Sequence, residues 1–316
     1  MKQGYSERRY IISAIFVIVA VIFVIRLFYI QVIDDSYKKM ADNNTLRILT
    51  EYPARGLIYD KNGKLLVYNE ATYDLMVVPK EVKNIDTADL CKLLGISREG
   101  FQARFDAARR YSPWVPSIFE KQIPKELYGF VQEKLFKFPG FYIQARTVRK
   151  YPLPIAPHVL GNIGEVNQNI IDKDHYYALG DYIGLTGIEK YYEKVLRGRK
   201  GRKIVMVDVF NREKGTLRQG VYNVPAIQGF NLYTYIDADL QQYGEALMRG
   251  KRGSIVAIDP STGGILAIVS SPSYDPNCLV GRNRGRNFKM LLEDKSKPLF
   301  DRALMAQYPP GSTFKL

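Results

Sequence analysis

A long apolar run dominates the start of the chain. Residues 11–25 are apolar at every position except Ser13, and the run continues past Arg26 to Ile33. As a helix this stretch would be about 34 Å long, enough to cross a bilayer core of about 30 Å. We therefore predict a single transmembrane anchor over residues 11–33. A cleaved signal peptide is the alternative, but no small-x-small cleavage site follows the run, which favours an uncleaved anchor.

The charges on either side orient the predicted anchor. Three basic residues precede it and two acidic residues follow it: Lys2, Arg8, Arg9, Asp34 and Asp35. Because basic residues stay on the cytoplasmic side of a span, we expect residues 1–10 to form a cytoplasmic tail. The rest of the chain is then expected on the outer side of that membrane.

Alternation of apolar and polar residues predicts a β-rich segment after the anchor. Residues 46–52 have the pattern of a strand, and residues 55–67 that of a hairpin turning at Asn62-Gly63. Residues 72–78 predict a further strand. From residue 87 to about 140 the apolar spacing is helical, with Phe130, Val131, Leu135 and Phe136 as one expected core stripe. Together these predict an elongated pedestal with a helical head.

A second pattern begins near residue 222, where we place a domain boundary. Before it we expect β structure over 141–166, a helix over 187–196 and a strand over 204–210. After it we expect a strand over 231–236, a helix over 238–249 capped by Asp237, and a hairpin of strands 253–259 and 264–270 buried on both faces. The predicted fold class is α+β, with a pedestal domain over 34–222 and a second domain over 223–316.

Composition narrows the function classes. Of 316 residues, 46% are hydrophobic, the formal net charge is +14, and there are two cysteines and two histidines. So few, widely spaced ligands argue against a metal site, a disulfide scaffold and a Ser-His-Asp triad. The positive charge indicates an anionic neighbour. The basic runs at 196–203 and 281–286 lack interleaved aromatic residues, so we expect no nucleic acid and interpret them as solvated loops or contacts to lipid or an anionic polymer.

The candidate chemistry lies at Pro309-Pro310-Gly311-Ser312-Thr313-Phe314-Lys315. A serine and a lysine three positions apart share one face of a helix, so the amine can take the hydroxyl proton and make Ser312 a nucleophile, with Lys315 as general base. Gly311 permits an abrupt entry into that helix, whose N-terminus is electropositive. The same spacing at Ser36 and Lys39 lies in a polar stretch with no preceding turn, and we interpret it as a chance match.

These motifs resemble the class B penicillin-binding proteins, most closely their cell-elongation branch. The resemblance covers residues 5–316. It rests on the anchor ending in Arg26-Leu27-Phe28 and on the motifs Arg55-Gly56-Leu57-Ile58-Tyr59-Asp60, His158-Val159-Leu160-Gly161, Gly184-Leu185-Thr186-Gly187-Ile188-Glu189, Ser271-Pro272-Ser273-Tyr274-Asp275-Pro276-Asn277 and Tyr308-Pro309-Pro310-Gly311-Ser312-Thr313-Phe314-Lys315. Phe300-Asp301-Arg302-Ala303 departs from the commoner Asn-Arg-Ala.

The resemblance implies a function and a fold. Residues 223–316 would begin a domain of the serine β-lactamase and transpeptidase fold, acting as a peptidoglycan D,D-transpeptidase during cell-wall elongation without a cofactor. Ser312 would attack stem peptides ending in D-Ala-D-Ala, Lys315 would be the base, and β-lactam antibiotics would acylate the same serine. Burial and nearby positive charge would keep Lys315 neutral. The other implied partners are the membrane, a SEDS-family glycosyltransferase and scaffold proteins of the elongation complex.

The family motifs Ser-x-Asn and Lys-Thr-Gly do not occur after Lys315 among these 316 residues. We therefore expect the 316-residue chain alone to be inactive, whether it is an N-terminal fragment or a shortened product. The alternative function is a non-catalytic membrane-anchored pedestal that binds and activates the glycosyltransferase. A penicillin-sensing receptor and a bifunctional class A enzyme fit less well, because the extra membrane spans of the one and the glycosyltransferase motif of the other are missing from the sequence.

The resemblance also nominates residues of the pedestal. Two family motifs supply Arg55, Gly56 and Asp60 on one side and Gly187 and Glu189 on the other. Because these motifs must pack together, we predict that the Arg55 guanidinium and the Glu189 carboxylate lie within about 4 Å of each other.

Overall fold

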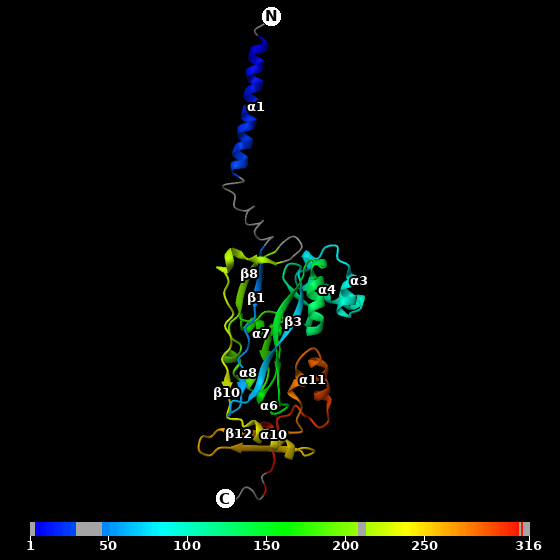
Figure 1. The fold of residues 1–316 in the computed structure, drawn as a ribbon, viewed down its shortest axis with the longest axis vertical. Helices are drawn as coiled ribbons and strands as arrows, with labels where there is room; N and C mark the ends of the chain where they lie inside the picture. The colour runs from blue at the N-terminus through cyan, green and yellow to red at the C-terminus, as the bar shows by residue number, and fades with distance from the viewer. Residues whose placement is uncertain (1–3, 30–45, 208–212, 310, 312–316) are drawn as a thin grey trace. The chain divides into compact units, whose positions relative to one another are not determined.

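The computed structural model describes residues 4–29, 46–207, 213–309 and 311 (Figure 1). Contacts divide the chain into two compact units, one of residues 1–49 and 203–223 and one of residues 50–202 and 224–316. Both helices and strands are present, so the predicted α+β class is confirmed.

The first unit contains the N-terminal helix and the larger part of a small sheet. Helix α1 (Gly4–Phe28) covers most of the apolar run, and the sheet has the order β1 (Leu46–Glu51), β8 (Gly201–Val207), β9 (Glu213–Thr216), followed by the turn η4 (Leu217–Gly220). Within the described ranges, no helix is both long enough and apolar enough to cross a membrane. The predicted anchor continues to residue 33, and residues 30–33 lie outside the described residues, so the anchor stays a prediction.

The second unit is built on one long strand. Strand β3 (Leu65–Val77) pairs with β2 (Ile58–Tyr59), β4 (Ser117–Ile123) and β5 (Phe141–Lys150), and β10 (Leu232–Tyr233) adds to β2 in parallel. The turn between β2 and β3 contains Asn62-Gly63, with Gly63 at φ 83°, so the predicted hairpin is confirmed. β3 continues without a break through the residues predicted as a separate strand.

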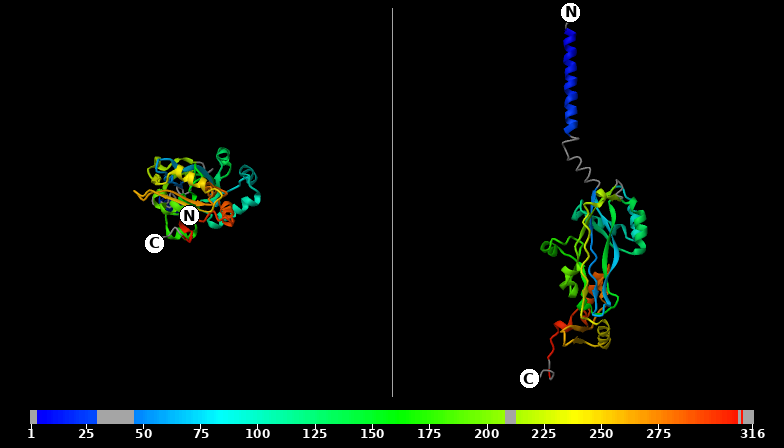
Figure 2. Two further views of the ribbon diagram at one scale, coloured as in Figure 1. Left: turned by 90° about the horizontal axis from the view of Figure 1, so that it is seen from below. Right: turned by 60° about the vertical axis from the view of Figure 1, so that its left-hand side comes forward.

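The helical head lies beside this sheet (Figure 2, right). It comprises α3 (Thr87–Leu94), α4 (Arg98–Tyr111), α5 (Lys125–Lys134) and the short η2 (Pro79–Glu81) and η3 (Leu135–Lys137). Asp86 and Ser97 cap α3 and α4 with their side chains. Val131 is fully buried, but Phe130 and Phe136 are 61% and 53% exposed, so the predicted apolar stripe is only partly core. The predicted helical region is also interrupted in sequence by strand β4, which pairs with β3 in the sheet.

Short elements follow the long strands of the pedestal and precede the C-terminal segment. They are α6 (Pro157–Leu160), β6 (Ile163–Glu165), α7 (Gln168–Lys173), β7 (Tyr182–Gly184), α8 (Gly187–Tyr191) and α9 (Glu193–Leu196). The helix predicted over 187–196 is thus broken at Tyr192, which adopts φ −99° and ψ 23°. The strand predicted over 231–236 is reduced to β10.

The C-terminal segment contains α10 (Ala238–Leu247), the hairpin β11 (Gly253–Ile258) and β12 (Ile265–Ser271), and the short η5 (Pro276–Leu279), α11 (Arg284–Glu293) and α12 (Arg302–Met305). Asp237 caps α10 as predicted, accepting bonds from two backbone N–H groups. α10 packs on one face of the hairpin (Figure 2, right). Val256 and Ile258 are 45% and 57% exposed, so the expectation of a hairpin buried on both faces is wrong for the described residues.

Two cores hold the second unit together. One lies in the head, around Leu75, Leu90 and Phe141. The other combines Ile58 and Leu66 of the pedestal with Ile236 and Ile268 of the C-terminal segment. This shared core crosses the predicted boundary at residue 222, which stays a prediction.

Candidate functional site

The predicted nucleophile and base, Ser312 and Lys315, lie outside the described residues. The preceding segment is described as far as Pro309, with Tyr308 60% exposed, and again at Gly311. Gly311 has φ 54°, a backbone conformation that favours glycine, in agreement with the predicted abrupt turn before the serine.

The pedestal residues form a buried ionic cluster. Arg55 Nη2 donates to Glu189 Oε2 at 2.6 Å, so the predicted contact is present. The same guanidinium donates to both carboxylate oxygens of Glu193, from Nη2 at 2.8 Å and from Nη1 at 3.1 Å. Arg149 Nε donates to Glu189 Oε1 at 2.6 Å. Two arginines therefore face two carboxylates, and the charge of the cluster is balanced.

A ring of hydrogen bonds closes this cluster. Arg149 Nη1 donates to Asn69 Oδ1 at 2.9 Å, and Asn69 Nδ2 donates to the backbone oxygen of Arg55 at 2.6 Å. Arg149 and Glu189 are both fully buried. A buried charge is stable only when it is paired and hydrogen-bonded, so this ring fixes the loop at Arg55 against β3, β5 and α8.

The cluster sets the ionisation of its members. Burial opposes ionisation of Glu193, but hydrogen bonds and charge from Arg55 outweigh it, and the pKa of Glu193 is lowered. Glu193 also accepts from Tyr177 Oη and from the Gly184 N–H, each at 2.8 Å. Burial alone would lower the pKa of Arg55, whereas Glu189 and Glu193 raise it. Both groups therefore stay charged at neutral pH.

The two motif glycines are required by close backbone contacts. A Cβ on Gly56 would lie 1.8 Å from the Phe230 carbonyl oxygen, and one on Gly187 would lie 2.4 Å from that of Val159. Gly187 also has φ 57°. No side chain fits at either position, so these glycines let the Arg55 and Glu189 segments approach their neighbours.

Asp60 connects the pedestal to the C-terminal segment. Its Oδ1 accepts from the N–H groups of Asn62 and Lys64 at 2.8 and 2.7 Å, which fixes the hairpin turn. Its Oδ2 accepts from the Ala238 N–H at 3.3 Å, at the start of α10. Asp60 thus links the β2–β3 turn to the start of α10.

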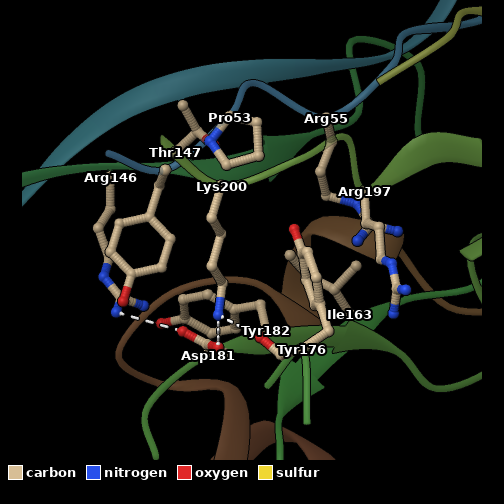
Figure 3. Close-up of a pocket in the computed structure, with 11 residues that line it drawn as sticks. Pro53, Arg55, Arg146, Thr147, Ile163, Tyr176, Asp181, Tyr182, Arg197 and Lys200 are labelled. Atoms are coloured by element: carbon tan, nitrogen blue, oxygen red, sulfur yellow. Dashed lines mark hydrogen bonds and ion pairs between the residues drawn. The ribbon is translucent and has the colours of Figure 1, made fainter. Parts of the chain in front are cut away.

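A second ionic cluster lines a cavity of about 60 Å³ (Figure 3). Arg146 Nε lies 3.2 Å from Asp74 Oδ2, and the Arg146 guanidinium lies 4.1 Å from the centre of the Tyr52 ring. Lys200 forms an ion pair with Asp181, whose other oxygen lies 3.9 Å from Arg146. Burial, the largest effect, raises the pKa of Tyr52 well above its ordinary value. This cavity contains no nucleophile and base arrangement of the kind predicted at Ser312.

The structure revises the interpretation of the two basic runs. In the first run, Arg197 pairs with Asp174 at 2.8 Å and Lys200 with Asp181, so only part of the run is solvated. In the second run, Arg282 pairs with Glu120 of the head, and Arg284 Nη2 lies 3.4 Å from Asn162 Oδ1.

Three further contacts secure the C-terminal segment on the pedestal. Asn277 exchanges hydrogen bonds with the backbone N–H and oxygen of Tyr151, at 3.1 and 2.9 Å. His158 Nε2 lies 2.8 Å from the Pro298 oxygen, and burial lowers the pKa of His158. The C-terminal segment is therefore attached to the pedestal through its own Asn277 side chain and through the pedestal side chain of His158.

Sequence reasoning missed Glu193, Arg149 and the cluster around Asp181. Glu193 follows Glu189 by four residues, a spacing that signals a shared helical face, but Arg149 gives no signal because it lies in a strand with other basic residues. Among the described residues, no group of three or more His, Cys, Asp or Glu side chains could hold a metal ion.

Comparisons with known proteins show which family the chain resembles. The family model of the Penicillin-binding Protein dimerisation domain matches residues 50–234, and that of the Penicillin binding protein transpeptidase domain matches residues 253–316. The chain is similar to the Peptidoglycan D,D-transpeptidase MrdA of Acinetobacter baumannii, with 34% identity over 99% of this chain and 47% of the relative. The Peptidoglycan D,D-transpeptidase MrdA of Escherichia coli K12 is 33% identical to this chain, over 93% of this chain and 47% of the relative.

Solved structures agree with these matches. A structure of Penicillin-Binding Protein (PBP2) from Helicobacter pylori has a TM-score of 0.61 and 28% identity, covering 84% of this chain and 51% of that one. A complex between PBP2 and MreC from the same organism has a TM-score of 0.61 and 26% identity. The match covers 81% of this chain and 49% of that one. The chain thus spans about half the length of the relatives it matches. With a dimerisation domain and transpeptidase-domain sequence in the expected order, the chain belongs to the penicillin-binding proteins, as its motifs predicted.

Proposed function

We propose that this chain is the N-terminal part of a serine-type peptidoglycan D,D-transpeptidase of cell-wall elongation. The observation that carries the proposal is the Ser312-Thr313-Phe314-Lys315 motif within residues 253–316, the segment matched by the transpeptidase family model. The names of the relatives and the left-handed turn at Gly311 support it.

In the proposed reaction Ser312 Oγ attacks the carbonyl carbon of the terminal D-Ala-D-Ala bond. Lys315 takes the hydroxyl proton and passes a proton to the departing D-alanine amine. The resulting acyl-serine ester is then attacked by an amine of a neighbouring strand, which forms the cross-link and releases the serine. A β-lactam would acylate Ser312 in the same way, but its ester persists.

The pedestal has a proposed part in this function. Its ionic cluster, together with Asp60 and Tyr151, supports the segment that leads to the serine motif. We also assign to it the binding of other elongation proteins, namely a SEDS-family glycosyltransferase and a scaffold protein. The solved complex of a similar protein with MreC supports a scaffold partner. As a non-catalytic pedestal alone, the chain would retain only this binding function.

The proposal places the protein in the cytoplasmic membrane, crossing it once. Residues 11–33 would be the anchor, residues 1–10 would be cytoplasmic, and the bulk of the chain would lie outside the membrane. The apolar run and its flanking charges support this. An alkaline phosphatase fused after residue 45 should be active, whereas phosphatase activity only in fusions placed before residue 11 would reverse the orientation.

Fluorescent penicillin tests the catalytic assignment. The product of the complete reading frame should be labelled covalently, and Ser312→Ala should abolish the label. Lys315→Ala should slow labelling by about 10²-fold or more, the range of a lost general base. Ser36→Ala, which removes the chance serine of the same spacing, should change nothing. Labelling that survives in Ser312→Ala would refute the assignment. Residues 1–316 alone should not be labelled, because Ser-x-Asn and Lys-Thr-Gly do not occur after Lys315 in them.

A further inference from the structure

One side of strand β10 is an open sheet edge. In the part of the chain that the structure describes, β10 pairs with β2 alone and ends the strand order β10-β2-β3-β4. Leu232 and Thr234 donate their N–H groups to the oxygens of Leu57 and Tyr59 at 2.8 and 2.9 Å. Successive residues of a strand point their backbone groups in opposite directions, so those of Tyr233 face away from β2. An edge of this kind can pair with a further strand.

Aromatic side chains surround this edge. Tyr233 is 70% exposed and stacks on Tyr59, with ring centroids 4.9 Å apart. Phe230 is 77% exposed, and its N–H donates to the oxygen of Val195 at 3.0 Å, which places α9 beside it. We call the following residues of β10 and its flanks the aromatic edge, each more than half exposed: Ile227, Phe230, Tyr233 and Tyr235.

Within residues 186–202 and 224–236 the exposed charged residues have one sign. Glu189 and Glu193 are the carboxylates of residues 186–202 and 224–236, and both are buried against Arg55. The exposed charged residues of these segments are all basic: Lys190, Lys194, Arg199 and Arg202. The ionic cluster that fixes the pedestal therefore buries the two carboxylates of these segments, while their four cations stay exposed.

We propose that the aromatic edge binds an extended segment of a partner protein, which adds as a strand beside β10. The segment alternates apolar side chains, which cover Phe230 and Tyr233, with Asp or Glu, which meet the exposed cations. A lipid surface offers no backbone to pair with the open N–H and C=O groups. A second copy of this chain would bring like charges together. This inference does not depend on Ser312 and goes beyond the catalytic function proposed above.

A pair of substitutions at one position separates backbone pairing from side-chain contact. Tyr233→Ala removes the ring and keeps the outward N–H, whereas Tyr233→Pro removes both. Proline is compatible with an edge strand, and the inward bonds to β2 come from Leu232 and Thr234. Phe230→Ser tests the apolar contact, and Phe136→Ser, an exposed phenylalanine of the head, is its matched control.

The probes are two synthetic decapeptides, one alternating Val with Glu and one alternating Val with Lys. Their binding to the whole chain in detergent is measured by fluorescence anisotropy. We expect the Glu peptide to bind at least tenfold more tightly than the Lys peptide, and to protect the amides of residues 231–235 from hydrogen exchange. Tyr233→Pro should weaken binding at least tenfold more than Tyr233→Ala does. Phe230→Ser should weaken it, and Phe136→Ser should not.

Several outcomes would overturn the proposal. Equal binding of the two peptides, or equal effects of Tyr233→Pro and Tyr233→Ala, would show that no acidic strand is added at this edge. Failure of the Glu peptide combined with binding to phosphatidylglycerol vesicles would assign the surface to lipid. Failure of the peptide combined with self-association that Phe230→Ser abolishes would assign it to a second copy. Unchanged far-UV circular dichroism of each variant shows that the fold is intact.

Discussion

Glu189 and Arg55, 134 residues apart in sequence, meet at 2.6 Å in the interior of the pedestal, where the Glu189 side chain is fully buried. The second carboxylate oxygen of Glu189 accepts from Arg149 at the same distance. One carboxylate thereby links the loop before β2, strand β5 and helix α8. The contact is a structural joint of the pedestal rather than a surface ion pair.

Removing this carboxylate should strongly destabilise the pedestal. Glu189→Ala leaves Arg149 buried without its acidic partner, and breaking a buried pair in this way costs about 3–5 kcal/mol. We expect a loss of that size in the free energy of unfolding, measured by urea denaturation followed by circular dichroism. Lys64→Ala, which removes an exposed ion pair with Asp239, is the control and should show no measurable change. A Glu189→Ala protein as stable as this control would contradict the assignment.

The ionisation of Glu193 should make the protein sensitive to acid. Its pKa is lower in the folded protein than in the unfolded chain, where a glutamate titrates at about 4.3. The unfolded state therefore binds the proton first. The stabilisation is complete above about pH 4.3 and is lost as the pH falls through the lower folded pKa. Urea midpoints measured from pH 6 to pH 3 should fall less steeply for Glu193→Gln than for the parent. Parallel curves would show that Glu193 is not stabilised in its charged form.

Local sequence signals predicted the local structure well. The Asn62-Gly63 turn, the Asp237 cap and the hairpin beyond Gly253 all depend on neighbouring residues, and all are present. The Arg55 to Glu189 contact was found only because both residues lie in motifs of one resembled family.

The remaining features depend on long-range packing. No local pattern shows that Arg149 faces Glu189, because the pairing is created by the strand order of β3 and β5. Phe130, Val131 and Phe136 belong to one predicted core stripe, yet the head buries Val131 and leaves both phenylalanine rings exposed. The basic run at 196–203 looks uniform in sequence, but Arg197 and Lys200 of this run line the cavity.

Gly56 should tolerate no side chain. Its N–H donates to the Leu196 oxygen at 2.9 Å, and the Phe230 oxygen occupies the place of a Cβ. Phe230 is itself held through its N–H bond to Val195, so neither segment can move away freely. We expect Gly56→Ala to cost about 3 kcal/mol, the upper part of the range for overpacking.

Gly129 provides the matched control for that substitution. It lies within α5, and a Cβ there would meet nothing within 4 Å. Gly129→Ala should therefore raise stability by about 0.5–1 kcal/mol, because alanine loses less backbone freedom on helix formation. Thermal unfolding of both variants gives the comparison. Equal behaviour of the two would mean that the close approach at Gly56 does not constrain the fold.

His158 should make the attachment of the C-terminal segment depend on pH. Burial is the largest effect on this imidazole and lowers its pKa below the 6.5 of an unfolded histidine, while the Pro298 oxygen 2.8 Å away and Asp301 oppose the shift. The unfolded chain then binds a proton at a higher pH than the folded protein does. Stability is complete above pH 6.5 and decreases as the pH falls from 6.5 towards the folded pKa. His158→Gln, which keeps a hydrogen-bond donor, should remove this decrease. Urea midpoints at pH 7.5, 6.5 and 5.5 measure it, with the exposed His175→Gln as control. A parent protein whose stability does not change between pH 7.5 and 5.5, or a decrease that persists in His158→Gln and vanishes in His175→Gln, would show that His158 is not the titrating group.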